Sequence, residues 1–521
     1  MRPPIWQPPV ALSQQEAQIV RRIRRAKLFV WLREHRHELF DAAFQAELAT
    51  LYKECARGQP PISPAQLALA LILQAYTGVS DDEVIEASQM DRRWQLVLDC
   101  LESEAAPFSK GTLVGFRQAL IAQDLDRRLI ERTVLLAQQQ GGRSPRGLRA
   151  ALDSSPLWGA SRVEDTYNLL GHALRKALGV IARQQGRGLA ELAAATGASI
   201  ATGSSLKAAL DRDWDDPAAQ AAALSAVLAA LESLEAWADT AQPPVPPALA
   251  EPLAAAHQVV AQDVVLAADA PPALRRGVAP ERRISIEDPE MRHGRKRRSL
   301  LVDGDKRHVL HDLDLGVVRA VGVTPANVPE ATVTDSIAAD LARQAGALAE
   351  LHIDRAYLSS TLVRERAPEV AIYCKAWPVR QGPHFAKTAF ALDWDAQTLT
   401  CPHAVSLPFV PGGTVHFPAA ACASCPLRER CTSSAQGRSV SIHPDERLLQ
   451  ELRERQQTPP GRASLRERVA VEHTLAHVGR WQGRRARYRG QRKNLFDLRR
   501  VAVVHNLHVL QRHAAADVIA A

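Results

Sequence analysis

The chain has 521 residues, of which 46% are hydrophobic and 23% are charged. These proportions are typical of soluble globular proteins and exclude a disordered chain, a collagen-like fibre and a disulfide-dense secreted scaffold. The length predicts roughly three or four domains. Seven cysteines are too few for a disulfide framework, which favours reduced thiols or a metal site. Because no apolar run reaches ~18 residues and the N-terminus lacks the apolar core of a signal peptide, we expect a cytoplasmic protein with no membrane partner.

The net charge of +8 is concentrated near the C-terminus. Residues 461–521 hold 13 Lys and Arg against 4 Asp and Glu, and residues 479–493 hold seven basic residues and no acid. An Arg-rich cluster is typical of a nucleic-acid binder, because guanidinium groups make paired hydrogen bonds to phosphate. A solvated charged face is the alternative interpretation. The candidate DNA-binding residues are Arg480, Arg484, Arg485, Arg487, Arg489, Arg492 and Lys493.

Residues 1–140 are predicted to be helical, beginning with a basic amphipathic stretch over 14–38. Ser63 is a candidate N-cap, with Pro64 at the first helical position and an apolar run over 67–75. A glycine break then precedes a second helix over 81–89, capped by Ser80. This spacing fits a DNA-binding helix-turn-helix, and it fits an ordinary helical bundle equally well.

The rest of the chain alternates between strands and helices. A strand over 148–152 is expected to end at Asp153, and an Ala-rich helical segment fills 165–280. Further strands are predicted over 283–287, 298–303, 307–313, 317–323 and 350–354, with a helix over 333–348. Residues 375–440 are irregular, and helices return from about residue 465.

Three carboxylates stand out in this pattern. Asp153 and Asp354 each follow an apolar strand, and Glu472 lies on a helix with Arg468 four residues before it, on the same face. Acids at strand ends project into the crevice where α/β proteins bind ligands. Three such acids gathered together could hold two divalent cations ~4 Å apart, an arrangement that suits in-line displacement at phosphorus. Each acid taken alone is better explained as a cap, turn residue or salt-bridge partner.

These residues give the chain its resemblance to a known family. The stretches Asp153-Ser-Ser-Pro-Leu-Trp-Gly, Asp354-Arg-Ala-Tyr357 and Arg468-x-x-x-Glu472 resemble motifs of the DDE transposases of bacterial insertion sequences, as does the tail Lys493-Asn-Leu-Phe-Asp-Leu-Arg-Arg. Residues 62–99 resemble the DNA-binding domain of that family. The resemblance covers most of the chain except the Ala-rich segment.

The resemblance implies an α/β fold: a ribonuclease-H-like mixed sheet flanked by helices, with an N-terminal all-helical domain and helical and zinc-bearing insertions. The expected domains are 1–140 (helical, DNA-binding), 141–164, 281–374 and 441–521 (catalytic), 165–280 (helical insertion) and 375–440 (cysteine-rich insertion).

It also implies an activity. Water would attack a phosphodiester at an element end, and the freed 3′-hydroxyl would attack target DNA, with Asp153, Asp354 and Glu472 binding two Mg²⁺ or Mn²⁺ ions. The partners would be the terminal repeats and target DNA, bound by a homodimer near the bacterial nucleoid.

Three further residues have competing interpretations. Arg468 would orient Glu472 or contact phosphate, or form only a helix salt bridge. Trp481 could stack on an unpaired base, although simple packing is the better interpretation. Tyr357 could contact phosphate, but a core tyrosine is again favoured.

Two departures from the family pattern concern DNA-end binding. A related signature has Tyr seven residues before the Glu and Lys seven residues after it, where this chain has Leu465 and Gly479, with Arg480 as a substitute for the lysine. Ala356 replaces a usual glycine, which reduces the freedom of that turn to adopt positive φ.

Four cysteines lie within residues 401–431, spaced C-x20-C-x2-C-x5-C: Cys401, Cys422, Cys425 and Cys431. A CxxC pair sets two thiolates on one turn, and two further thiolates complete a tetrahedral, structural Zn²⁺ site. His403 and His416 are alternative ligands should one cysteine not bind the ion, and four unrelated thiols are the less favoured interpretation. Cys55, Cys100 and Cys374 have the character of ordinary buried thiols.

Two other classes of function stay open on the sequence. One is a metal-dependent nuclease that cuts DNA without joining it. The other is a DNA-binding protein without catalysis, either by nature or as a decayed element copy. Replacing the three acids would be silent in a binding protein and would abolish cleavage in a transposase.

Overall fold

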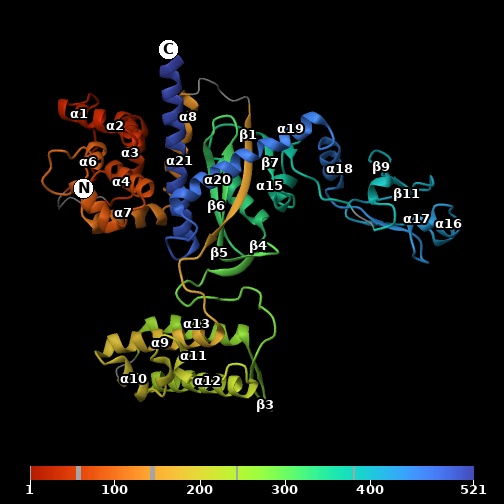
Figure 1. The fold of residues 1–521 in the computed structure, drawn as a ribbon, viewed down its shortest axis with the longest axis horizontal. Coiled ribbons are helices and arrows are strands. Elements are labelled where there is room, and N and C mark those ends of the chain that lie inside the picture. Colours follow the sequence, from red (N-terminus) through yellow and green to blue (C-terminus); the bar gives the residue numbers. More distant parts are fainter. Residues whose placement is uncertain (1, 54–59, 141–146, 242–244, 380–381, 521) are drawn as a thin grey trace.

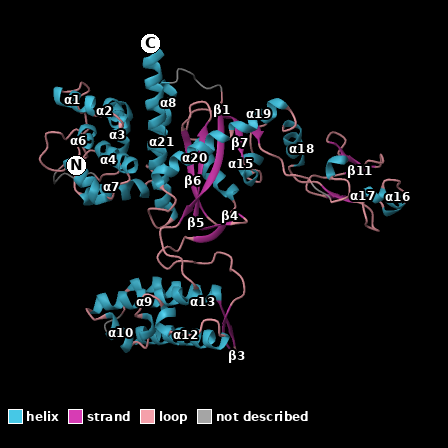
Figure 2. Ribbon diagram, viewed as in Figure 1, coloured by secondary structure: helices cyan, strands magenta, loops and turns pink. Residues whose placement is uncertain are grey.

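The computed structural model describes residues 2–53, 60–140, 147–241, 245–379 and 382–520. A central sheet carries the long C-terminal helix on one side, and the N-terminal helices pack beyond that helix (Figure 1). A helical insertion projects from one end of the sheet, and the cysteine-rich segment extends to the side (Figures 1 and 2).

The N-terminal region is helical, as predicted. Its helices are α1 (Gln14–Arg22), α2 (Lys27–Leu39), α3 (Ala42–Ala49), α4 (Pro64–Thr77), α5 (Asp81–Met90), α6 (Arg92–Leu98), α7 (Lys110–Ala122) and α8 (Arg127–Gln140). Ser80 caps α5 in a capping box with Glu83, which satisfies free N–H groups at the helix start. Gly78 ends α4 in the left-handed region at φ 77°. The predicted helix–turn–helix is therefore present as a backbone arrangement.

The central sheet is mixed. It consists of β1 (Leu148–Trp158), β4 (Arg292–Arg297), β5 (Leu300–Asp312), β6 (Val318–Pro325), β7 (Leu348–Ile353) and β8 (Ala371–Tyr373). Its order is β4-β5-β1-β7-β8, and β6 also pairs with β5. β5 runs antiparallel to β1, β4 and β6, whereas β7 is parallel to both β1 and β8.

Several predicted boundaries are wrong. β1 continues through Asp153 to Trp158 because β5 supplies pairing partners along that whole length, so Asp153 lies in mid-strand. The strands predicted over 298–303 and 307–313 are not separate, because one continuous β5 passes through Gly304. A Cβ at Gly304 would lie 2.3 Å from the Gly159 nitrogen, and glycine allows this close approach to β1.

Two other predicted elements differ from the structure. Residues 283–287, all described, form no strand; this extended segment buries Ile284 and Ile286 instead. The helix predicted over 333–348 is shorter, α14 (Thr334–Leu341), and Gly346 adopts φ 110° just before β7 begins.

Helices cover both faces of the sheet. On β1, Ala151 belongs to the core shared with α8, with α20 (Val469–Gln482) and with α21 (Gln491–Ala520). The alternate residue Leu152 faces the opposite core, which α14, α15 (Thr361–Arg364) and α18 (Glu446–Arg455) complete. Because side chains alternate along a strand, Asp153 lies on the face of Ala151, toward α20.

The family-like tail at the start of α21 attaches that helix to the N-terminal region. Arg500 donates to the Gln74 side chain of α4 (2.6 Å) and to Asp497 (2.5 Å), and all three residues are buried. Arg492 pairs with Asp126 (2.5 Å). The N-terminal helices and the sheet therefore share one continuous core.

The Ala-rich segment forms a separate helical unit with its own core. It contains α9 (Thr166–Gln185), α10 (Leu189–Ala195), α11 (Leu206–Leu210), α12 (Pro217–Thr240), α13 (Ala250–Asp263) and a small hairpin of β2 (Val264–Ala267) and β3 (Ala270–Leu274). Among the described residues, α12 is the one helix long and apolar enough to cross a membrane. One of its faces is buried in the core of this unit, which accounts for that apolar composition.

The cysteine-rich segment is built from short elements around a small apolar core. They are β9 (Ala391–Asp393), β10 (Thr398–Thr400), β11 (Ser406–Pro408), β12 (Thr414–His416), α16 (Ala419–Ala423), α17 (Arg428–Cys431) and β13 (Ser439–Ser441). From there α18 and α19 (Pro459–Glu467) lead back to α20.

Asp305 on β5 makes the stability of the fold pH-dependent. Burial, together with the nearby Asp288 and Glu290 carboxylates, raises the pKa of Asp305 to about 7. An acid whose pKa is higher in the folded than in the unfolded state stabilises the fold below its unfolded pKa and loses that contribution as pH rises through its folded pKa. We therefore expect Asp305→Asn to raise the free energy of unfolding by roughly 2–4 kcal/mol at pH 8 relative to the wild type, and by much less at pH 5. Denaturant titrations at both pH values measure this; an equal change at the two would contradict it.

Candidate active site

Asp153 and Asp354 lie side by side on neighbouring parallel strands. The register of β1 and β7 pairs Leu152 with Ile353, so the two acids are the next residues along each strand. Asp153 is 8% exposed, and its Oδ1 accepts a hydrogen bond from the Ser154 backbone N–H (2.8 Å). Asp354 is exposed and caps the short helical turn that follows β7.

Glu472 reaches the same place from α20. Val471 and Leu475 bury one face of this helix in the core, which leaves Glu472 on its exposed edge. Arg468 joins two of the acids, because one guanidinium nitrogen lies 2.7 Å from Asp153 Oδ2 and the other lies 2.7 Å from Glu472 Oε1. Arg468 is thus more than a local helix salt bridge, since it connects the helix to the central strand.

The carboxylates of Asp153 and Asp354 lie close enough to repel each other electrostatically. Burial raises the pKa of Asp153, and the Asp354 carboxylate raises it further, against the lowering effects of the Ser154 N–H, Arg468 and Lys296. Two neighbouring carboxylates are strained by mutual repulsion, which a divalent cation offsets. In the part of the chain that the structure describes, no three His, Cys, Asp or Glu side chains are placed to hold an ion. Between Asp153 and Glu472 the guanidinium of Arg468 supplies the positive charge.

A buried polar chain lies beneath the carboxylates. Tyr357 is fully buried, and its hydroxyl lies 2.8 Å from Nδ1 of His308, whose Nε2 lies 2.9 Å from Thr324 Oγ1. Burial lowers the pKa of His308 to about 3, so this histidine is neutral at physiological pH. Tyr357 is therefore a core tyrosine, out of reach of a phosphate, which agrees with the interpretation favoured from the sequence.

Lys296 is a site residue that sequence reasoning missed. It extends from β4, donates to Ser154 Oγ (2.5 Å) and pairs with Glu330 (3.0 Å). It places a cation next to the strand that carries Asp153. The one sequence signal for it was the basic run over 292–298, which was not predicted as a strand.

The basic segment 479–493 is divided between internal contacts and free cations. Two arginines donate to backbone oxygens: Arg485 to residues 159–161 and Arg487 to Val79. Two others form ion pairs, Arg489 with Glu287 and Arg492 with Asp126. Arg484 lies over the Trp158 ring at 5.0 Å. Among the described residues, Arg480 and Lys493 have no ion-pair partner, and both are exposed.

Trp481 is placed for packing. Its ring stacks on His508 at 5.2 Å between centroids, and its edge meets His477 at 4.4 Å. It is half-buried against the core that joins α20 and α21. These contacts account for the residue without an unpaired base.

In the N-terminal region, the charge on each helix bears on which one can approach DNA. The exposed face of α5 is acidic, with Asp82, Glu83 and Glu86, and would repel phosphates. A cluster of exposed cations lies instead at the corner between α1 and α2, namely Arg21, Arg22, Arg24, Arg25 and Lys27.

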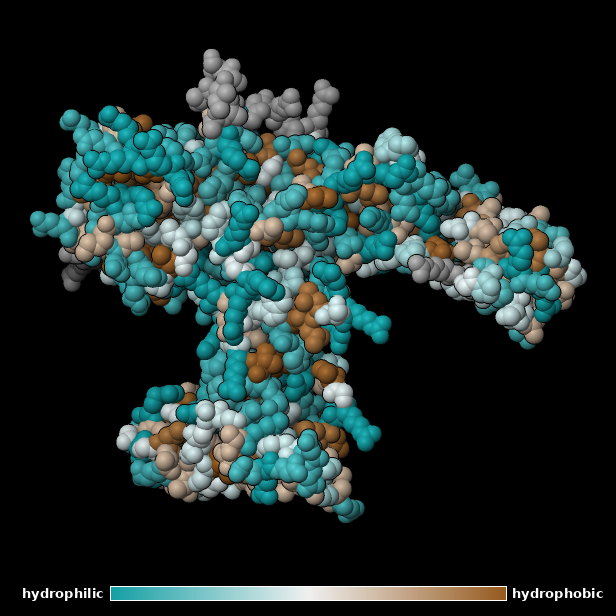
Figure 3. Space-filling model, viewed as in Figure 1, coloured by the Kyte–Doolittle hydropathy of each residue, from teal (hydrophilic) through white to brown (hydrophobic). Residues whose placement is uncertain are grey.

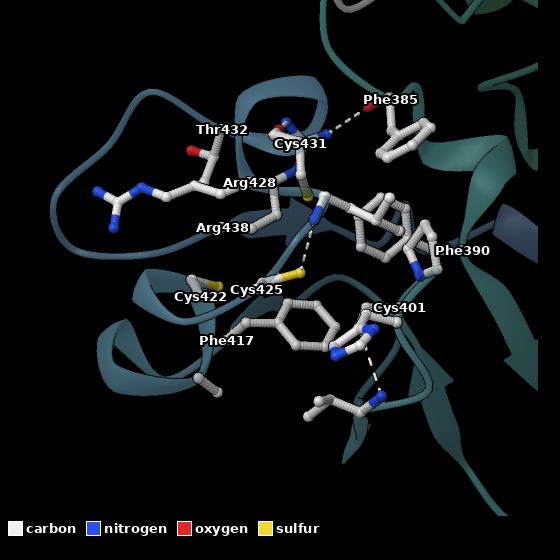
Figure 4. Close-up of a pocket in the computed structure, with 15 residues that line it drawn as sticks. Phe385, Phe390, Cys401, Phe417, Cys422, Cys425, Arg428, Cys431, Thr432 and Arg438 are labelled. Carbon is white, nitrogen blue, oxygen red and sulfur yellow. Dashed lines mark hydrogen bonds between the residues drawn. The ribbon is translucent and has the colours of Figure 1, made fainter.

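The four clustered cysteines line one pocket, with a volume of about 30 Å³ (Figure 4). The Val405 N–H donates to Cys401 Sγ and the Leu427 N–H to Cys425 Sγ, both at 3.4 Å. His403 also lines the pocket, whereas His416 does not. Cys100 and Cys374 are buried elsewhere, as predicted, and Cys55 lies outside the described residues.

Two family models match the chain. The model described as Transposase domain (DUF772) matches residues 18–119, and the model described as Transposase DDE domain matches residues 401–511. The second range contains the four cysteines, Glu472 and the basic segment, and the first contains α2 to α6. No curated protein and no solved structure matches the chain.

Proposed function

We infer that this chain, a DDE-type transposase of the insertion-sequence type, cleaves DNA at the ends of its element and joins the freed 3′-hydroxyl to target DNA. The observation that carries the proposal is that Arg468 bridges Asp153 on β1 and Glu472 on α20, while the register of β1 and β7 places Asp354 next to Asp153.

The sheet supports a ribonuclease-H-like catalytic domain. Along the path β6-β5-β1-β7-β8, β5 runs antiparallel to both β6 and β1, whereas β1, β7 and β8 run parallel to one another. Helices cover both faces of this sheet. Each proposed catalytic acid lies on a different element of this unit, and the helical and cysteine-rich segments are inserted between those elements. We propose the domain division 1–140, 165–280 and 375–440 around the split catalytic unit on this basis.

In the proposed reaction the three carboxylates hold two Mg²⁺ or Mn²⁺ ions. The donor set fits such cations, because all three ligands are carboxylate oxygens and the repulsion between Asp153 and Asp354 would be relieved. The ions would activate the attacking oxygen and stabilise the leaving oxygen. Arg468 keeps Glu472 and Asp153 at a fixed separation, and Lys296 and Ser154 hold β4 against β1 beside them.

We propose a structural Zn²⁺ for the cysteine pocket. Four thiols that line one pocket, those of Cys401, Cys422, Cys425 and Cys431, provide the donor set of a closed tetrahedral site. This ion would hold the short strands of the segment in place.

The partners would be element ends and target DNA, approached by the α1–α2 corner, Arg480, Arg484 and Lys493. Because two ends must be processed together, we propose a homodimer assembled on DNA. The remaining arginines of the basic segment would act on DNA indirectly, since their internal contacts position this surface.

Joining distinguishes a transposase from a nuclease. With paired element-end duplexes, Mg²⁺ and supercoiled target plasmid, we expect 3′-end nicking followed by covalent joining of the ends to the plasmid. If the protein cleaves the ends but does not join them to the plasmid, even when the ends are supplied already nicked, the result would support a nuclease without joining activity. Binding without any nicking, in Mg²⁺ or Mn²⁺, would support a binding protein.

A further inference from the structure

We propose that a groove along α9 of the helical insertion binds the phosphate backbone of the DNA that the active site processes. The inference rests on the proposed function and gives a DNA contact to a part of the chain outside both matched family ranges. The groove has a volume of about 330 Å³ and is lined by residues of α9, by Gly203 and Ser204, and by Glu287. It lies apart from the three carboxylates.

The groove presents cations without internal partners. Arg162, Arg175 and Arg183 line it and are exposed, and none of them has a hydrogen-bond or ion-pair partner within the described ranges. Other arginines of this unit are paired, such as Arg282 with Asp263 (2.8 Å) and Arg187 with Glu191 (3.0 Å). Unpaired guanidinium groups around one groove fit an external anion, and phosphate suits their planar fork.

The two carboxylates that line the groove, those of Glu164 and Glu287, do not prevent it from binding a phosphate. Glu164 and Glu287 flank His172, at 2.9 Å from Nδ1 and 3.3 Å from Nε2. The hydrogen bond that His172 donates to Glu164 raises the pKa of His172, which favours the positive form of this histidine between the two carboxylates. Glu287 also pairs with Arg489 of the basic segment. Both carboxylates are thus neutralised locally, and the groove keeps a positive excess.

The spacing of the arginines suits a nucleic-acid strand. Arg175 and Arg183 are eight residues apart on α9, which places them on one face about 12 Å apart. That distance spans about three to four nucleotides at ~3.4 Å per step. Gly179 lies between them, and an added Cβ there would touch only Arg183, so no side chain blocks the approach of a sugar–phosphate backbone.

The segment that leads from the active site to the groove carries further arginines. The part of β1 between Asp153 and Trp158 is about 17 Å long, given the rise per residue of a β-strand. Arg484 lies over the Trp158 ring, and Arg485 donates to Ser161, the residue before Arg162. On the face drawn in Figure 3, the neck between the sheet and the insertion carries hydrophilic residues and several hydrophobic patches. A duplex engaged at the carboxylates can therefore pass Arg484 and enter the α9 groove.

The salt dependence of DNA binding tests the proposal. We compare full-length wild type, Arg175→Gln/Arg183→Gln, Arg175→Lys/Arg183→Lys and the matched control Arg212→Gln/Arg276→Gln, which removes two exposed arginines of the same insertion outside the groove. The probe is a 60-base-pair random-sequence duplex, titrated from 50 to 300 mM salt. We expect the glutamine pair in the groove to lower the slope of log K against log salt by about 1.8 and weaken binding about tenfold. The lysine pair should keep the slope, and the control should match the wild type.

The outcomes separate the two proposals. If the groove variant and the control have equal slopes, the groove does not bind DNA, whereas the proposed catalysis stands or falls on nicking by the wild type. If the groove variant loses slope but the wild type never nicks, the groove is supported and the catalytic proposal fails. A wild type that does not bind the duplex at all contradicts both. Unchanged thermal transitions of the variants show that the loss is not one of folding.

Discussion

Glu472→Gln is expected to abolish metal-dependent nicking of element ends while leaving DNA binding intact. The amide keeps the size of the side chain and its hydrogen bond from Arg468, but removes the negative charge that a cation requires. Asp153→Asn and Asp354→Asn should act in the same way. We expect each change to lower the nicking rate about 10³-fold or more, which corresponds to about 4 kcal/mol of transition-state stabilisation. Single-turnover nicking of a labelled duplex measures the rate.

The carboxylates should also behave as a unit. The double variant Asp153→Asn/Glu472→Gln should be no slower than either single variant, because one missing ligand already disables the site. Glu467→Gln is the matched control: Glu467 lies five residues before Glu472 and pairs with Arg149, away from the cluster, so nicking should be retained. Additive losses, or equal losses in the control, would contradict a shared metal site.

Removal of zinc from the cysteine pocket is expected to unfold the segment around it. The segment has only a small apolar core, and structural Zn²⁺ contributes roughly 10–16 kcal/mol of apparent binding free energy in small zinc modules. We expect one Zn²⁺ per chain in the purified protein and none in Cys422→Ser/Cys425→Ser. Limited proteolysis should then cut between residues 382 and 441 in the variant and leave this region intact in the wild type.

His416→Ala is the control for the zinc prediction. His416 was a candidate ligand in the sequence but does not line the pocket, so its removal should change neither zinc content nor protease resistance. His403→Ala, inside the pocket, tests whether a histidine replaces one of the thiols. Because burial raises the pKa of Cys431, the zinc affinity of the wild type should fall as pH is lowered. If a zinc-free preparation of the protein resisted protease as well as the zinc-bound wild type, the result would contradict the proposal.

The carboxylates were predictable because they follow local patterns. An apolar run before Asp153, another before Asp354 and helical spacing from Arg468 to Glu472 are all visible within a few residues. Nothing local could show that the strand continues beyond Asp153 or that β5 passes through Gly304. Both depend on pairing between β1 and β5, which are separated in sequence by the whole helical insertion.

The roles of individual arginines were the least predictable feature. Arg487 donates to Val79, 408 residues away, and Arg500 donates to Gln74 across 426 residues. A charge count marks such residues as a DNA-binding surface, whereas their guanidinium groups are used to join the C-terminal helix to the N-terminal helices. The free arginines of α9 lie in the Ala-rich segment, for which the sequence offered no candidate site residue, because their role depends on which of their spatial neighbours carry an opposite charge.

The most direct test of the account is Mn²⁺ binding measured by calorimetry and by electron paramagnetic resonance. The wild type should bind two Mn²⁺ ions per chain at the carboxylates, with DNA ends present to complete their coordination, and Asp153→Asn/Glu472→Gln should lose both while still binding DNA. Equal Mn²⁺ binding by the wild type and the double variant would contradict the claim that Asp153, Asp354 and Glu472 form the catalytic metal site.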